Sequence, residues 1–123
     1  MAILNDRVLD NGLTVLDTEA NKILITSQEA TTFTEANVTY ALGDSTSLSI
    51  GAPADRAGGG REVVVAAITD GSVTGTGTAT HYAILDTVNS RLLATSTLTD
   101  SQSVTTGNTF TLSSVAIGIP DPA

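Results

Sequence analysis

The sequence lacks cysteine and tryptophan, and it has only two phenylalanines and two tyrosines among its 123 residues. Without cysteine, a disulfide framework and a thiolate metal site are both excluded. Aromatic side chains bury more area each than aliphatic ones, so the core must be built from Val, Ile, Leu and Ala. A core of this kind gains stability from association with further subunits. The composition therefore hints at an oligomer or a part of a larger assembly.

Basic residues are also scarce. Five Lys and Arg residues face 13 Asp and Glu residues, which gives a formal net charge of −8. Binding to nucleic acid or to an anionic membrane surface depends on clustered Lys and Arg. The basic positions are instead dispersed: Arg7, Lys22, Arg56, Arg61 and Arg91. We therefore expect neither nucleic-acid binding nor membrane binding.

Long apolar runs are missing as well. No run approaches the roughly 20 residues of a transmembrane helix. The opening MAILNDRVLDNG lacks the basic start and the apolar stretch of a signal peptide. These features predict a soluble protein that is synthesised in the cytoplasm.

Threonine, valine and isoleucine are abundant, and these residue types favour strands. Strands are predicted over 12–17, 22–27, 37–44, 45–51, 61–70, 71–86, 91–98 and within 103–120. No segment has a long helical apolar period, and strands do not alternate with helices. The predicted fold is all-β: a single-domain antiparallel β-sandwich or barrel with an extended N-terminal arm over 1–11.

The connections between these strands are predicted from turn residues. Turns are expected over 18–21 and 99–102, at Asp70-Gly71 and at Gly107-Asn108. Residues 28–37 are expected to form a loop with room for a helical turn. The glycine-rich segment 52–60 is expected to be a flexible loop, because successive glycines allow almost any backbone conformation. The continuous apolar run within 61–70 predicts a strand that is buried on both faces.

The stretch THYAILDTVNSRLLATSTL, residues 80–98, contains the only histidine. We predict a hairpin, with 80–86 going out, 87–90 turning and 91–98 returning. Strand alternation places Ala83 and Leu85 on the same face as His81, so no nucleophile or acid accompanies the imidazole locally. His81 is therefore interpreted as a strand residue.

Other chemical signatures are also incomplete. No serine lies in a Gly-x-Ser-x-Gly elbow, and AGGGRE lacks the Lys-Ser/Thr ending of a phosphate-binding loop. No aromatic platform for a sugar accompanies the carboxylates, and no EF-hand spacing occurs, although calcium binding by turn carboxylates stays open. We expect no catalytic, cofactor-binding or metal site, and no cofactor.

Two segments carry a family resemblance. They are MAILNDRVLDNGLTVLDTEANKILITSQEATTFTEA at the start and ATHYAILDTVNSRLLATSTLTDSQSVTTGNTFTLSSVAIGIPDPA at the end, roughly two thirds of the chain. They resemble capsid decoration (cement) proteins of tailed bacteriophages, or related small virion structural proteins. The resemblance implies a β-rich fold, no enzymatic activity, and attachment to the outer surface of the major capsid protein lattice. The expected location is the virion, on the capsid exterior.

Two regions are predicted to contact the capsid or a sister subunit. One is the apolar N-terminal arm and the other is the glycine-rich loop. The predicted contact residues are Ile3, Leu4, Arg7, Val8, Leu9, Arg56, Gly58, Gly59 and Arg61. A homo-oligomer is expected, and a trimer is favoured because a cyclic assembly matches the three-fold positions of a capsid lattice.

Other functions stay open at this point. A receptor-binding or glycan-binding β module would need an exposed aromatic residue or a carboxylate–metal cluster in a concave site. Another tail or head–tail structural protein would share the same composition. A small hydrolase would depend on His81, the only histidine of the chain.

Overall fold

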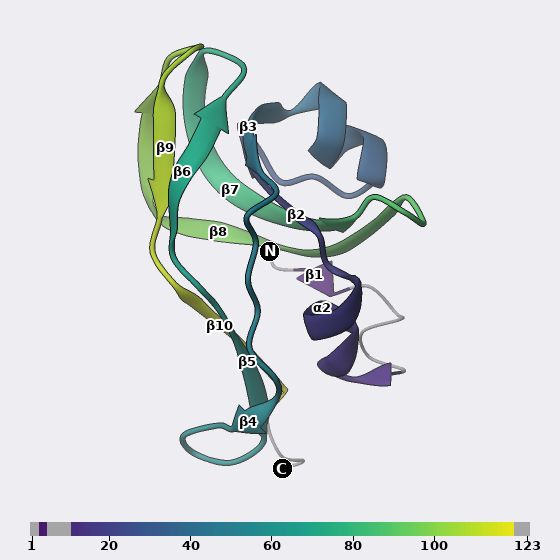
Figure 1. Ribbon diagram of the computed structural model, residues 1–123. Coiled ribbons are helices and arrows are strands. Elements are labelled where there is room, and N and C mark those ends of the chain that lie inside the picture. Colours follow the sequence, from purple (N-terminus) through teal and green to yellow (C-terminus); the bar gives the residue numbers. More distant parts are fainter. Residues whose placement is uncertain (1–2, 5–10, 120–123) are drawn as a thin grey trace.

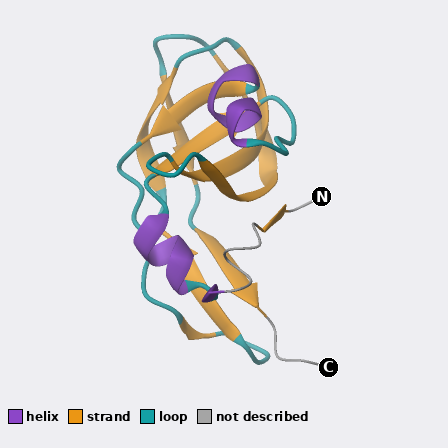
Figure 2. Cartoon of the chain, turned by 90° about the vertical axis from the view of Figure 1, so that its right-hand side faces the viewer, coloured by secondary structure: helices purple, strands orange, loops and turns teal. Residues whose placement is uncertain are grey.

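The computed structural model describes residues 3–4 and 11–119 (Figures 1 and 2). The elements in chain order are β1 (Ile3–Leu4), α2 (Thr14–Glu19), β2 (Lys22–Thr26), η1 (Glu35–Thr39, a π-helix), β3 (Ala41–Ser45), β4 (Ala54–Asp55), β5 (Arg61–Val65), β6 (Ile68–Val73), β7 (Gly77–Asp86), β8 (Arg91–Val104), β9 (Thr109–Leu112) and β10 (Val115–Ile119). Among the described helices, none has the length and apolarity needed to span a bilayer.

Most strands belong to one curled antiparallel sheet with the order β1-β8-β7-β2-β3-β6-β9. The curl brings β9 at one end of this order back toward β8 near the other end (Figure 1). The two strands are not paired through their backbones. Instead, the Gln102 Nε2 of β8 donates a hydrogen bond to the Thr111 carbonyl of β9 (2.8 Å). The all-β prediction is confirmed, and the sheet is an incompletely closed barrel.

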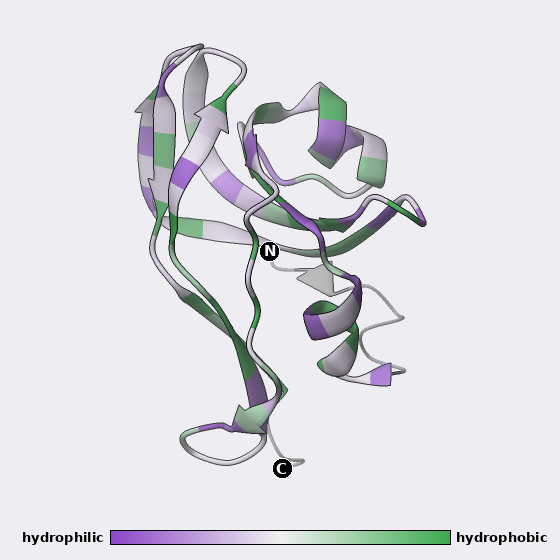
Figure 3. Ribbon diagram, viewed as in Figure 1, coloured by the Kyte–Doolittle hydropathy of each residue, from purple (hydrophilic) through white to green (hydrophobic). Residues whose placement is uncertain are grey.

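A second sheet, with the order β10-β5-β4, extends away from the curled sheet (Figure 1). Two chain segments run through both sheets. β5 continues into β6, β9 continues into β10, and the pairing runs from Val65↔Val115 in one sheet to Ile68↔Leu112 in the other. The two sheets are thus joined by one two-stranded ribbon, which carries mostly apolar residues along β5 (Figure 3).

The main core joins the two sheets and α2 in one cluster. Its members come from the inner face of the curled sheet, from the buried side of β5 and β10, and from α2. Examples of these buried residues are Leu16, Ile25, Val63, Ile84, Leu93, Phe110 and Ile117. As the composition indicates, most of the volume is aliphatic, and Phe110 and Tyr82 are the only aromatic residues in this cluster.

A smaller core lies on the outer face of the curled sheet, beneath η1. Leu24, Ala83 and Leu85 project from β2 and β7, and Ala30 and Ala36 cover them from the η1 segment. Both faces of these central strands are therefore buried. That explains why Ile23, Leu24, Ile25 and their neighbours form a continuous apolar run instead of an alternating one.

The predicted strand over 12–17 is wrong, because Thr14–Glu19 forms α2. Leu13 and Val15 alternate as in a strand, but Leu16 is also fully buried. Leu13 and Leu16, three residues apart, lie on one face of a helix, which lets both reach the core. The Thr18 hydroxyl also donates a hydrogen bond to the Thr14 carbonyl (2.8 Å).

The single strand predicted over 61–70 is two strands in two sheets. β5 has alternating burial, with Val63 and Val65 buried and Val64 half-exposed, so it is not buried on both faces as predicted. Asp70-Gly71 lies within β6 and is not a hairpin turn. The reason is packing: a Cβ on Gly71 would lie 2.3 Å from the Phe110 ring, so glycine is needed where the aromatic ring crosses the strand.

Other boundaries also differ from the predictions. Residues 37–39 belong to η1, and β3 covers only Ala41–Ser45. The strand predicted over 45–51 is reduced to an isolated bridge between Ile50 and Val65. The turn predicted over 99–102 lies inside β8, and β4 interrupts the loop predicted over 52–60. The strand over 22–27 and the hairpin over 80–98 are confirmed as β2 and as β7–β8.

Candidate functional site

The predicted N-terminal contact residues are partly described. β1 pairs with β8 of the same chain, in the register Ile3↔Thr95 and Leu4↔Ala94. Arg7, Val8 and Leu9 lie outside the described residues. The contact predicted for this segment therefore stays a prediction.

The predicted contact residues of the glycine-rich segment lie together at the end of the small sheet. Gly58 and Gly59 have positive φ angles of 87° and 105°, in the turn between β4 and β5. Arg56 Nη1 donates to the Gly59 carbonyl (2.9 Å), and the Arg61 guanidinium lies 2.6 Å from an Asp55 carboxylate oxygen. Both arginines are thus engaged within the hairpin.

His81 lies on β7 with its side chain half-buried. The Thr80 hydroxyl lies 2.8 Å from His81 Nδ1, and the same hydroxyl lies 3.0 Å from the Ser27 carbonyl. This arrangement ties β7 to the segment after β2. It agrees with the interpretation of His81 as a strand residue. Among the described residues, no group of three or more His, Cys, Asp or Glu side chains could hold a metal ion.

A polar cluster holds the η1 segment. Thr31 donates to Glu35 Oε1 from its backbone and from its hydroxyl (both 2.8 Å), and these bonds lower the pKa of Glu35. The Tyr40 hydroxyl donates to Glu35 Oε2 (3.3 Å), and the Glu35 charge raises the pKa of Tyr40. The cluster fastens both ends of η1 over the outer core.

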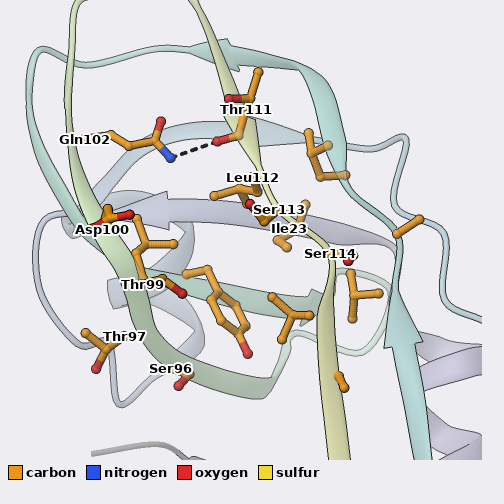
Figure 4. A pocket seen from close by; sticks show the side chains of 17 residues that line it. Ile23, Ser96, Thr97, Thr99, Asp100, Gln102, Thr111, Leu112, Ser113 and Ser114 are labelled. Atoms are coloured by element: carbon orange, nitrogen blue, oxygen red, sulfur yellow. Dashed lines mark hydrogen bonds between the residues drawn. The ribbon is translucent and has the colours of Figure 1, made fainter.

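A hollow lies between β8 and the β9–β10 connection (Figure 4). We call it the seam cavity. It has a volume of about 340 Å³, near the lower end for ligand sites. The cavity forms because β8 bulges. Ala79 of β7 pairs with Gln102 of β8, and His81 of β7 pairs with Thr97 of β8. The four residues of β8 between Thr97 and Gln102 therefore lie opposite a single residue of β7, Thr80.

The floor of the seam cavity is apolar and its rim is polar. Ile23, Ile68 and Tyr82 line it from three strands. The rim carries serine and threonine hydroxyls, the Gln102 amide and the Asp100 carboxylate. The rim residues are Ser96, Thr97, Thr99, Asp100, Gln102, Thr111, Ser113 and Ser114 (Figure 4).

Tyr82 is the aromatic residue of this floor, and it is only 6% exposed. Burial raises the pKa of Tyr82, and a hydrogen bond with Ser96 offsets this only in part. The phenol therefore stays protonated at neutral pH. It can donate and accept hydrogen bonds, but it cannot supply a negative charge.

The charges of the cavity have one sign. Asp100 is exposed at the rim, and no lysine, arginine or histidine lines the cavity. Elsewhere in the described chain, Lys22 lies near Asp44 (3.8 Å), Arg61 near Asp55 and Arg91 near Glu19 (3.4 Å). The cations are thus engaged inside the molecule, whereas Asp100 has no hydrogen-bond or ion-pair partner among the described residues.

Comparisons with known proteins add no further information: no protein-family model, curated protein or solved structure matches the chain.

The sequence indicated the seam cavity only indirectly. The turn residues of 99–102 mark the irregular part of β8, but they predict a chain reversal where the structure has a bulge. The opposite wall, Ser113 to Ala116, consists of the β9–β10 connection and the start of β10, where the chain passes between two sheets whose separation the sequence does not reveal.

Proposed function

We propose that this protein is a structural virion protein that binds the outer surface of a phage capsid and stabilises the major capsid protein lattice. The observation that carries the proposal is the likeness of segments 1–36 and 79–123 to small decoration proteins. The second of these segments builds most of β7 and all of β8, β9 and β10, and so supplies strands to both sheets. Decoration would add buried interface between neighbouring capsomers, and many copies would act together.

The distribution of charge supports a protein partner. The net charge is −8, and the described cations are engaged within the chain. Such a surface repels phosphate backbones and favours basic protein surfaces. We expect binding to capsids to weaken as salt rises, because exposed charges are screened over about 10 Å at 0.1 M ionic strength.

The experiment is a binding assay with capsids that lack this protein, followed by image reconstruction of the decorated particle. Density on the capsid exterior is the expected result. A double variant, Val8→Asp with Leu9→Asp, should reduce occupancy, because it places charge on the predicted apolar contact. It keeps Ile3 and Leu4, whose backbones pair with β8.

The matched control is Val88→Ser, at the tip of the β7–β8 hairpin. Val88 is 81% exposed and lies outside the predicted contact residues, so its replacement should leave occupancy unchanged. Density found only in the tail would overturn the proposal. It would favour the other tail or head–tail structural role.

A homo-oligomer, with a trimer favoured, is part of the proposal. The aliphatic core is small, and the small sheet extends away from the main body with Val64 48% exposed. Sedimentation analysis should give a mass three times that of the chain. A monomer at all concentrations, and on the capsid, would contradict this part alone.

A receptor-binding or glycan-binding module is the second candidate, and the seam cavity is the observation that favours it. Its rim of hydroxyls and one amide suits a sugar, but its aromatic residue, Tyr82, is nearly buried. A glycan array tests this candidate directly. Saturable binding at micromolar affinity, together with no binding to capsids, would replace the first proposal.

A further inference from the structure

We propose that the seam cavity accepts a lysine or arginine side chain of a partner protein. The aliphatic stem of that side chain lies on the apolar floor, and its cationic head lies beside Asp100 at the rim. The inference rests on the proposed function in one respect, since it assigns a contact to the protein partner named there.

The floor fits the stem of such a side chain. Ile23 and Ile68 face the cavity together with the ring of Tyr82. Long basic side chains bury their methylene groups along apolar surface and keep the charged head at the edge. A cavity of about 340 Å³ is roomy enough for one side chain of this shape and too small for a folded element.

The rim fits the charged head. Asp100 supplies the negative charge, and the hydroxyls of Thr99 and Ser113 lie on opposite walls as further hydrogen-bond acceptors (Figure 4). Ammonium and guanidinium groups carry only donors, so a rim of acceptors suits them. An anionic ligand would meet Asp100 and no cation.

The described chain does not satisfy Asp100 itself. Arg56 and Arg61 are held in the β4–β5 hairpin, Arg91 lies near Glu19, and Lys22 lies near Asp44 and donates to Asn37 (2.9 Å). Among the described residues, no cation is placed to supply the charge complement of the rim.

The test is an NMR titration of the full chain with N-acetyl-lysine-N-methylamide. We expect saturable shifts confined to the amides of 96–102 and 111–116. Asp100→Asn should raise the dissociation constant about fivefold, the upper range for one exposed ion pair. The norleucine analogue has the same stem without the ammonium group, and it should bind more weakly by a similar factor.

The matched control is Asp17→Asn on α2, which removes the same charge away from the cavity and should leave the dissociation constant unchanged. Equal effects of Asp17→Asn and Asp100→Asn would show a general charge effect and overturn the inference. Shifts outside the seam, or saturable binding of a neutral monosaccharide with no response to the lysine probe, would also overturn it.

The capsid assay separates this inference from the proposed function. If Asp100→Asn binds capsids as the natural chain does, the function stands and the inference fails. If the lysine probe binds as expected but capsids do not bind, the function fails while the cavity keeps its assigned ligand.

Discussion

At the scale of single residues, the described structure depends on a few positions where one atom more or less changes the packing. Phe110 is 2% exposed and crosses two neighbouring strands, where glycines make room for its ring. A Cβ on Gly43 would lie 3.0 Å from that ring, and one on Gly71 would lie 2.3 Å from it. The Phe110 ring thus packs in space that is available only because Gly43 and Gly71 have no side chains.

Gly71→Ala should lower the free energy of unfolding by about 1–3 kcal/mol, the usual cost of overpacking a core. Chemical denaturation measures this change. Gly51→Ala is the control, because a Cβ there meets nothing within 4 Å, and it should stay within about 0.5 kcal/mol of the natural chain. Combining Gly71→Ala with Phe110→Leu should cost less than the sum of the two single changes. Additive effects would contradict the proposed clash.

Asp86 is the buried carboxylate at the end of β7, and it is 2% exposed. It accepts bonds from the backbone N–H of Val88 (3.0 Å) and from the Asn89 side chain (2.8 Å). Burial raises the pKa of Asp86, but the bonds from Asn89 and Val88 and the charge of Arg91 outweigh burial. The pKa of Asp86 therefore lies below its ordinary value.

Because the pKa of Asp86 is lower in the folded state, the direction in which its contribution to stability changes with pH is fixed. The contribution of Asp86 is complete above the unfolded pKa of about 3.9, and it is lost as the pH falls through the lower folded pKa. Asp86→Ala should destabilise the protein by about 1–3 kcal/mol at pH 7, because it leaves the turn N–H groups without an acceptor. Unfolding curves from pH 7 to pH 2 should show this difference shrinking toward acid. A difference that does not depend on pH would count against the ionised acceptor.

At the scale of elements, the β7–β8 hairpin is the part that sequence reasoning predicted best. Its turn residues, 87–90, lie between the strands as expected. Ser90 has a φ of 55° and is the one described non-glycine residue with a positive value. Serine adopts this conformation at a cost that glycine avoids.

Ser90→Gly should therefore raise the free energy of unfolding, by about 0.5–1 kcal/mol. Ser90→Val should lower it by about 1 kcal/mol or more, because a β-branched residue resists positive φ. Thermal denaturation of the two variants, compared with the natural chain, measures both changes. Shifts of the same sign would show that the turn geometry does not govern stability here.

The successes and failures of the sequence predictions have a physical cause. Strand-favouring residue types and turn residues are local signals, so they predicted β2 and the β7–β8 hairpin. Helix α2 was missed because Leu13 and Val15 alternate as in a strand over so short a segment. The break between β5 and β6 depends on which sheet each half joins, and the seam cavity depends on the curl of the whole sheet. No local pattern records either of these features.

At the scale of the whole molecule, the described chain combines a main core that joins both sheets with a surface whose cations are engaged within the chain. The core stabilises both sheets together. The surface leaves acidic groups such as Asp100 for other molecules. This separation between a core that stabilises the fold and an acidic surface favours a protein that functions by contact with a partner, as proposed above. Both binding assays test that contact.

The ribbon that joins the two sheets also bears on how the chain matures during synthesis. β5 and β6 leave the ribosome well before β9 and β10, the partners that complete their pairing. Until residues 109–119 are made, each earlier strand has an open edge, and such edges are prone to wrong association. A chain that stops before this point lacks the strands that pair with β5 in one sheet and with β6 in the other, so neither sheet is complete until both partners have been made.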